Sequence, residues 1–174
     1  EQSNKRLVVV APTGVAAINA KGVTIHSFFQ LPFGPILPEQ LFSISPQKKI
    51  KQAAVQKFNK RKIDLIRSLD LLIIDEVSMV RADLLDGIDQ VLRRFKNATE
   101  VFGGVQVLMI GDLQQLSPVV KENEWAILRS HYETSFFFSS KAFLQSNAIH
   151  IELKHIFRQE NQEFIEILNQ IRNN

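Results

Sequence analysis

Three short runs of apolar residues, rich in β-branched side chains, occur at residues 7–11, 71–74 and 105–110. Runs of this kind are typical of strands that are buried on both faces, as in parallel sheets. Between the second and third runs, residues 81–95 carry apolar side chains at offsets 0, 1, 4, 7, 8 and 11 from Leu84, which is one face of a helix. Strand, helix and strand in this order predict a βαβ unit with a right-handed crossover. We therefore expect an α/β fold with a mainly parallel sheet between helices.

Residues 31–69 have a different character. Their first part contains Gly34 and four prolines, and their second part carries eight of the 21 basic residues of the chain, with Asp64 as the only acid between 48 and 67. We interpret this stretch as a Pro-rich and basic insertion between two strands. A further helix is predicted over 161–172, where apolar residues again recur on one face. The basic residues of the insertion are Lys48, Lys49, Lys51, Lys57, Lys60, Arg61, Lys62 and Arg67.

Composition narrows the class of protein without assigning a function. The 174 residues are 45% hydrophobic, which suits one domain with a core and excludes disorder, and the absence of Cys excludes thiolate chemistry. The net charge of +3 is too small to indicate nucleic-acid binding by itself. No apolar run approaches the roughly 18 residues that span a bilayer, so we expect no membrane partner and an intracellular location.

Two adjacent carboxylates, Asp75 and Glu76, directly follow the apolar run at 71–74. Open α/β sheets bind ligands at the carboxyl edge of their strands. Asp75 could hold Mg²⁺ there, directly or through water, because hard cations prefer carboxylate oxygens. Glu76 could polarise the water that attacks a γ-phosphate. The alternative is that both acids cap the next helix, because acidic residues favour helix N-termini.

A second strand end has related chemistry. The run at 105–110 leads into Gly111 and Asp112, followed by two amides, Gln114 and Gln115, and by Pro118. An amide can contact phosphate oxygens or the attacking water without adding charge, so it suits a γ-phosphate sensor. The alternative is a tight turn whose glutamines face solvent.

The first strand ends at small residues, Pro12, Thr13 and Gly14, that would let a phosphate approach the backbone at a helix N-terminus. Farther on, His26 precedes Phe28 and Phe29. His26 could donate to a DNA phosphate or stack on a base, with a phenylalanine in support. On local grounds alone, a structural histidine beside core phenylalanines is the favoured interpretation.

Arg158 could reach a γ-phosphate as an arginine finger. The phosphate-gripping motif Gly-x-x-x-x-Gly-Lys-Ser/Thr is absent, because none of the seven glycines is followed by Lys. We expect this loop and its strand to lie upstream of Glu1.

In their order along the chain, these motifs resemble those of the Pif (petite integration frequency) DNA helicases, RecD-like members of helicase superfamily 1. The most specific are Asp75-Glu76-Val77-Ser78-Met79 and Gly111-Asp112-Leu113-Gln114-Gln115-Leu116. The others lie at 11–17, 24–29, 103–106 and 157–159. The resemblance implies a RecA-like P-loop NTPase fold. It further implies that residues 1–174 form a partial first RecA-like domain, without Walker A or the second RecA-like domain, and that residues 31–69 hold a small wedge insertion.

The resemblance also implies residue roles. Asp75 corresponds to the Mg²⁺ ligand, Glu76 to the catalytic carboxylate, Gln115 to the γ-phosphate sensor and Arg158 to the arginine that faces the γ-phosphate; Asp112 lies in the same nucleotide-binding motif as Gln115. The boxes that track single-stranded DNA contain Pro12, Thr13, Gly14, His26 and Phe28.

The implied parent is an ATP- and Mg²⁺-dependent DNA helicase that translocates 5′ to 3′ and acts in genome maintenance, including repair and telomere maintenance. Its partners would be single-stranded and forked DNA and its own second RecA-like domain. Its location would be the nucleoid, or the nucleus or mitochondrion in a eukaryote. We expect this chain alone to bind neither ATP nor Mg²⁺ tightly and to be inactive. Two alternatives stay open: a catalytically silent nucleic-acid-binding module, and a P-loop ATPase that acts on a substrate other than DNA.

Overall fold

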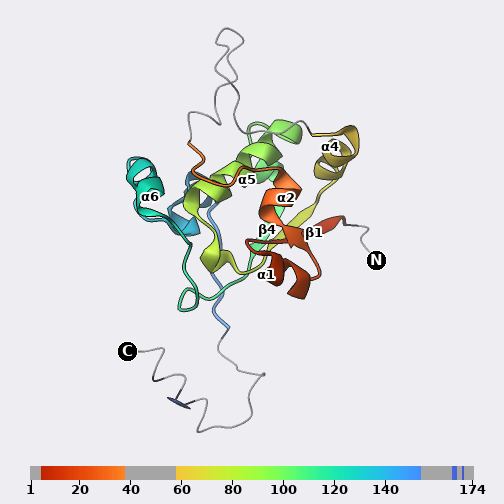
Figure 1. Ribbon diagram of the computed structural model, residues 1–174. Helices are drawn as coiled ribbons and strands as arrows, with labels where there is room; N and C mark the ends of the chain where they lie inside the picture. The colour runs from red at the N-terminus through yellow and green to blue at the C-terminus, as the bar shows by residue number, and fades with distance from the viewer. Residues whose placement is uncertain (1–4, 38–57, 154–165, 168–169, 171–174) are drawn as a thin grey trace.

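The computed structural model describes residues 5–37, 58–153, 166, 167 and 170 (Figure 1). Its sheet contains β1 (Leu7–Ala11), β2 (Val23–Thr24), β3 (Leu71–Ile74) and β4 (Gln106–Met109), in the order β2-β1-β3-β4. All three pairings are parallel. The three apolar runs therefore form the three longer strands, as predicted. The short strand β2 was not predicted from the sequence.

Helix α5 (Ala82–Phe95) connects β3 to the η2 turn (Val101–Gly104) and β4, which confirms the βαβ unit. In Figure 1, α5 lies on one side of the strands and α1 (Gly14–Asn19) on the other. The predicted apolar face of α5 is buried against the strands, with Leu85, Ile88 and Leu92 fully enclosed. This packing forms the main hydrophobic core.

Three aspartates of helix α5 are also buried. Asp83, Asp86 and Asp89 are each less than 8% exposed, and each carboxylate accepts a backbone N–H from another segment. The donors are Ile36 to Asp83 at 2.8 Å, Ala142 to Asp86 at 2.8 Å and Phe102 to Asp89 at 2.5 Å. Buried carboxylates persist only when such donors satisfy them. These three therefore fasten three loops to one helix.

Strand β4 differs from the prediction that its run is buried on both faces. Val107 and Met109 lie beside Leu72 and Ile74 and pack against the core, but Leu108 is 47% exposed on the other face. The reason is position: β4 is the last strand in the order of the described sheet, and the core covers one of its faces.

Short helices complete the described part of the chain. They are α2 (Ile25–Phe29), α4 (Lys60–Arg67), α6 (Glu122–Leu128) and α7 (Lys141–Gln145), with 3₁₀ turns η1 (Val77–Met79) and η3 (Phe137–Ser139). Side chains that favour N-caps begin α1, α2, α4 and α7: Thr13, Thr24, Asn59 and Ser140 each accept a backbone N–H from the first turn.

Some predictions fall partly outside this description. Of the insertion at 31–69, the structure describes 31–37 and 58–69, which include α4, and Lys48, Lys49, Lys51 and Lys57 lie outside. Of the tail helix predicted over 161–172, residues 166, 167 and 170 are described, and they are helical. Among the described residues, no helix has both the length and the apolarity to cross a membrane.

Candidate functional site at the carboxyl edge of the sheet

The parallel strands deliver most of the predicted site residues to one edge. In register, Val10 of β1 pairs with Ile74 of β3, which pairs with Met109 of β4, and Ala11 pairs with Thr24 of β2. The residues that follow these four strand ends are those that the sequence singled out: Pro12, Thr13 and Gly14 after β1, His26 in the helix after β2, Asp75 and Glu76 after β3, and Asp112 and Gln115 after β4. A parallel topology therefore gathers segments that are far apart in the sequence.

The turn that carries the two acids is anchored on both sides. Asp75 N–H donates to the Val10 carbonyl oxygen at 2.9 Å, and Val77 N–H donates to the Ile110 carbonyl oxygen at 2.9 Å. Between them, Glu76 adopts a left-handed conformation with φ 52° and ψ 45°, which is uncommon for a residue other than Gly. The neighbouring strands thus hold Glu76 in an unfavourable backbone conformation.

Both carboxylates are available to a ligand. Asp75 and Glu76 are half-buried, and among the described residues no side chain or backbone N–H donates to either carboxylate. Mg²⁺ is commonly held by one or two protein carboxylates together with substrate phosphates. This donor set fits that mode of binding. Among the described residues there is no cluster of three or more His, Cys, Asp or Glu suited to a metal. The alternative that these acids serve as helix caps does not match the geometry: η1 has no side-chain cap, and α5 begins later, at Ala82.

Gly111 brings the turn after β4 against the turn after β3. A Cβ atom at this position would lie 3.0 Å from Val77 N and 3.1 Å from Ser78 N, so any other residue would require the two turns to shift apart. The two most specific motifs of the sequence therefore touch through the backbone.

The loop beyond Gly111 is organised by Asp112. Its carboxylate accepts the Gln114 N–H at 3.1 Å and the Gln115 Nε2–H at 3.1 Å. Gln115 is exposed, and its amide is oriented by Asp112. Asp112 is thus a positioning residue for the Gln115 side chain.

The turn after β1 is a helix start. Thr13 Oγ accepts the Ala16 N–H at 3.2 Å and caps α1, and a Cβ on Gly14 would meet no atom within 4 Å. The hydroxyl of Thr13 keeps its own proton for donation to a ligand. Pro12 is half-buried beside it. Phosphate or DNA contact by these three residues stays a prediction.

The aromatic part of the site includes a buried ring. Phe28 is 3% exposed, its ring packs edge-on against Phe29 at 4.8 Å, and the Lys62 Nζ lies 4.2 Å from the ring centroid. Helix α2 thus turns the Phe28 ring into the core, and a part for Phe28 in DNA binding stays a prediction.

The exposed aromatic is instead Phe33, which is 89% exposed and stacks on His26 with ring centroids 4.6 Å apart. Sequence reasoning missed it, although its place in a Pro- and Gly-rich loop (Pro32, Gly34 and Pro35) was a usable signal. Burial, and then the nearby Arg81 guanidinium, lower the pKa of His26, while Asp83 partly opposes this. The neutral imidazole is favoured as a result.

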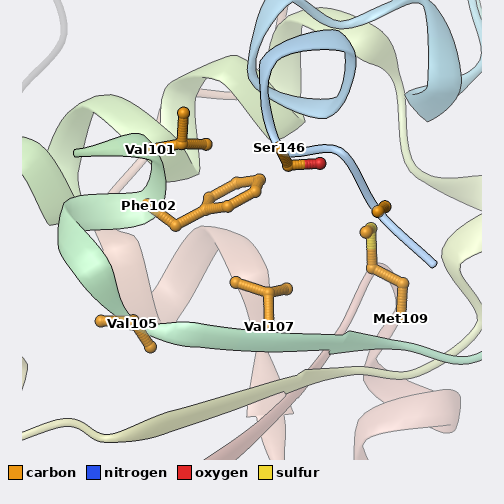
Figure 2. A pocket seen from close by; sticks show the side chains of 7 residues that line it. Val101, Phe102, Val105, Val107, Met109 and Ser146 are labelled. Atoms are coloured by element: carbon orange, nitrogen blue, oxygen red, sulfur yellow. The ribbon is translucent and has the colours of Figure 1, made fainter.

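The structure also contains a cavity of about 190 Å³ between η2, β4 and the segment after α7 (Figure 2). Phe102, Val107 and Met109 are among its lining residues, and its hydroxyl, Ser146 Oγ, donates to the Phe143 carbonyl oxygen. No charged side chain and none of the predicted site residues lines it. The cavity is therefore separate from the candidate site at the sheet edge. Arg158, the remaining predicted catalytic residue, lies outside the described residues.

A parallel sheet whose carboxyl edge presents an available carboxylate pair beside an amide-bearing loop fits the RecA-like class of P-loop NTPase domains. The PIF1-like helicase family model matches residues 1–174, and the chain belongs to that family. This confirms the resemblance and the fold class drawn from the sequence.

Relatives and solved structures agree with this assignment. The chain is 36% identical over 169 residues to the ATP-dependent DNA helicase PIF1 of Emericella nidulans, covering 96% of this chain and 20% of that protein. The chain is 37% identical to the ATP-dependent DNA helicase PIF1 of Candida albicans, over 97% of this chain and 18% of that protein. The chain spans about a fifth of the length of these curated relatives.

The Pif1 helicase of Bacteroides, solved in complex with ADP-AlF3 and single-stranded DNA, superposes with a TM-score of 0.85 at 48% identity, over 99% of this chain and 38% of that chain. The Pif1 helicase of Candida albicans gives a TM-score of 0.70 at 36% identity, over 95% of this chain and 33% of that chain.

Proposed function

We propose that this chain is part of the first RecA-like motor domain of an ATP-dependent DNA helicase that moves 5′ to 3′ on single-stranded DNA and unwinds forked duplexes. The observation that carries the proposal is the convergence of Asp75, Glu76 and the Asp112–Gln115 pair at one sheet edge, in a chain whose relatives are ATP-dependent DNA helicases. The complex of a 48% identical Pif1 with ADP-AlF3 and single-stranded DNA supports both ligands.

In this proposal, each residue of the edge has one task. Asp75 holds Mg²⁺, which supplies charge neutralisation at the phosphates. Glu76 accepts the proton of the attacking water, and its backbone is held in a left-handed turn directly after β3. Gln115, oriented by Asp112, donates its amide to the γ-phosphate. Arg158 is proposed to stabilise the same phosphate from the segment beyond the described residues.

The phosphate grip is proposed to come from outside residues 1–174, because no glycine of the chain is followed by Lys. The second RecA-like domain, which would close over the nucleotide, is proposed to lie outside these residues as well. Residues 31–69 are proposed as the wedge insertion near the point of strand separation. By itself the chain is then expected to show no ATP turnover.

The test is ATP hydrolysis by the full-length protein encoded by the gene, with and without single-stranded DNA, and unwinding of a fork with a 5′ tail. We expect turnover that needs Mg²⁺ and rises on addition of DNA, and a His26→Ala variant that loses the rise. An ATPase rate that is the same with and without DNA, in wild type and in the variant, would favour an ATPase that acts on another substrate. DNA binding without turnover would favour a silent nucleic-acid-binding module.

A further inference from the structure

Phe33 is placed where it contributes little to folding. Its side chain is 89% exposed, and the contact recorded for its ring is the stack on His26, at 4.6 Å between centroids and 14° between planes. Exposure of this extent shows that the second face of the ring is open to solvent. A large aromatic ring with one face supported and one face open is suited to stacking on a planar ligand.

The backbone on the C-terminal side of Phe33 is held at two points. Arg81 Nη2 donates to the Gly34 carbonyl oxygen at 2.6 Å, and Ile36 N–H donates to Asp83 Oδ2 at 2.8 Å. Arg81 and Asp83 are themselves paired at 2.6 Å, with side chains 14% and 0% exposed. Gly34 takes φ 129°, a conformation that favours glycine. The loop is therefore built to one shape by buried, charged side chains, although the ring that it presents is exposed.

Basic charge is concentrated on α4, a helix that contacts α2, and this charge suits a polyanion. Helix α4 carries Lys60, Arg61, Lys62 and Arg67 against the single acid Asp64. Lys62 Nζ lies 4.2 Å from the ring centroid of Phe28, on the same helix α2 that carries His26, so α4 contacts the helix from which the aromatic pair is built. Basic side chains and open aromatic rings together are the means by which proteins hold single-stranded nucleic acid.

Resting on the proposed function, we propose that Phe33 stacks on a base of the bound single strand and that Arg81 and Asp83 position it by fixing Gly34 and Ile36. The ring reads no sequence, because every base offers a π-face. The neutral imidazole of His26 stacks on the opposite face of the Phe33 ring and supports it. Arg81 is a positioning residue that acts through the loop, and it joins the DNA surface to the start of α5, five residues after Glu76.

The experiment measures the coupling between Phe33 and one base. Wild-type full-length protein and variants are titrated with a short oligothymidylate and with a series in which one nucleotide at a time is abasic, so that every phosphate is kept. Phe33→Leu removes the stack, Phe33→Trp retains it, and Arg81→Gln releases the loop. Arg93→Gln is the matched control, because Arg93 lies on the same helix and pairs with a buried acid, Asp89, at 2.7 Å.

We expect one abasic position at which wild type loses roughly tenfold in affinity and Phe33→Leu loses nothing further. In Phe33→Trp, which keeps the stack, the abasic nucleotide at that position should again lower the affinity roughly tenfold. Arg81→Gln should weaken binding to the intact strand by roughly three- to fivefold, as the fraction of competent loop falls, and should reduce the abasic effect. Arg93→Gln should match wild type in both measurements.

Equal abasic profiles for wild type and Phe33→Leu would overturn the inference while leaving DNA binding intact. The assignment to Arg81 would fall if Arg93→Gln weakened binding as much as Arg81→Gln, because the effect would then be one of helix stability. A wild-type protein that binds no single-stranded DNA would overturn the proposed function itself, and this inference with it.

Discussion

Two groups of carboxylates lie within 15 residues of each other and have opposite surroundings. Asp75 and Glu76 stand in a turn at the sheet edge, and no described residue donates to their carboxylates. Asp83, Asp86 and Asp89 lie on α5, buried, and each receives a backbone N–H. The difference teaches that the donors already present, rather than the acid itself, separate a carboxylate that binds a ligand from one that holds the fold together.

The sharpest way to break this comparison is Glu76→Gln in the full-length protein. The substitution keeps the shape and removes the proton acceptor, so we expect DNA-stimulated turnover to fall roughly a thousandfold. The free energy of unfolding should stay within about 0.5 kcal/mol of wild type, since no described residue donates to this carboxylate. Steady-state ATPase assays and chemical denaturation measure the two quantities. Turnover close to wild type would exclude Glu76 as the base.

Asp86→Ala should show the opposite pattern. The change leaves three donors without a partner: Tyr132 Oη at 2.9 Å, Ala142 N at 2.8 Å and Lys141 N at 3.2 Å. We expect the free energy of unfolding to fall by about 3 kcal/mol, with turnover per folded molecule retained. Asp64→Ala is the control, because Asp64 is exposed on α4 and should stay within about 0.5 kcal/mol. Equal effects of the two variants in denaturation would contradict a structural role for Asp86.

Gly111→Ala tests the contact between the two site turns. The added methyl would lie 3.0 Å from Val77 N, so the turns must separate. We expect a loss of about 1–2 kcal/mol in the free energy of unfolding, together with reduced turnover, because Glu76 shares the displaced turn. Gly14→Ala is the control for stability, since a Cβ there meets no atom within 4 Å. If both variants unfold alike, the close approach at Gly111 is not the cause.

The smallest expected effect concerns His26. Its pKa is lowered in the folded protein below the ordinary value of 6.5, first by burial and then by Arg81. The unfolded chain therefore binds more protons just below pH 6.5, and the free energy of unfolding decreases as the pH falls through that window. His26→Gln should flatten this slope, which denaturation at a series of pH values would measure. A slope that survives the substitution must arise from another group.

The hydrophobic pattern predicted most of the sheet and α5. Continuous apolar runs and apolar residues on one face of a helix arise because those residues are buried in the fold. The pattern also predicted most of the candidate residues, since parallel strands bring the residues after them to one edge whatever their distance in sequence. Strand β2 was not predicted, because a strand of two residues is too short to show an alternating or continuous apolar pattern.

Sequence reasoning missed the exposed ring of Phe33 for another reason. The local sequence shows that several aromatic residues are close together but does not show which of them are buried. The burial of Phe28 depends on the packing of α2 against β1 and α5, and Phe33 lies in the loop beyond α2. The buried acids of α5 escaped for a related reason: their donors lie up to 56 residues away, in loops with no pattern of their own. Long-range partners are set by tertiary structure, and a local reading of the sequence does not contain them.

The left-handed turn at Glu76 also bears on protein engineering. A glycine at this position would adopt φ 52° without steric penalty, whereas glutamate carries a penalty of about 1 kcal/mol. A screen for thermostable variants would therefore be drawn toward replacing the residue that the proposed chemistry needs most. Consensus or directed-evolution work on this domain should hold position 76 constant, because selection for stability and selection for turnover pull it in opposite directions.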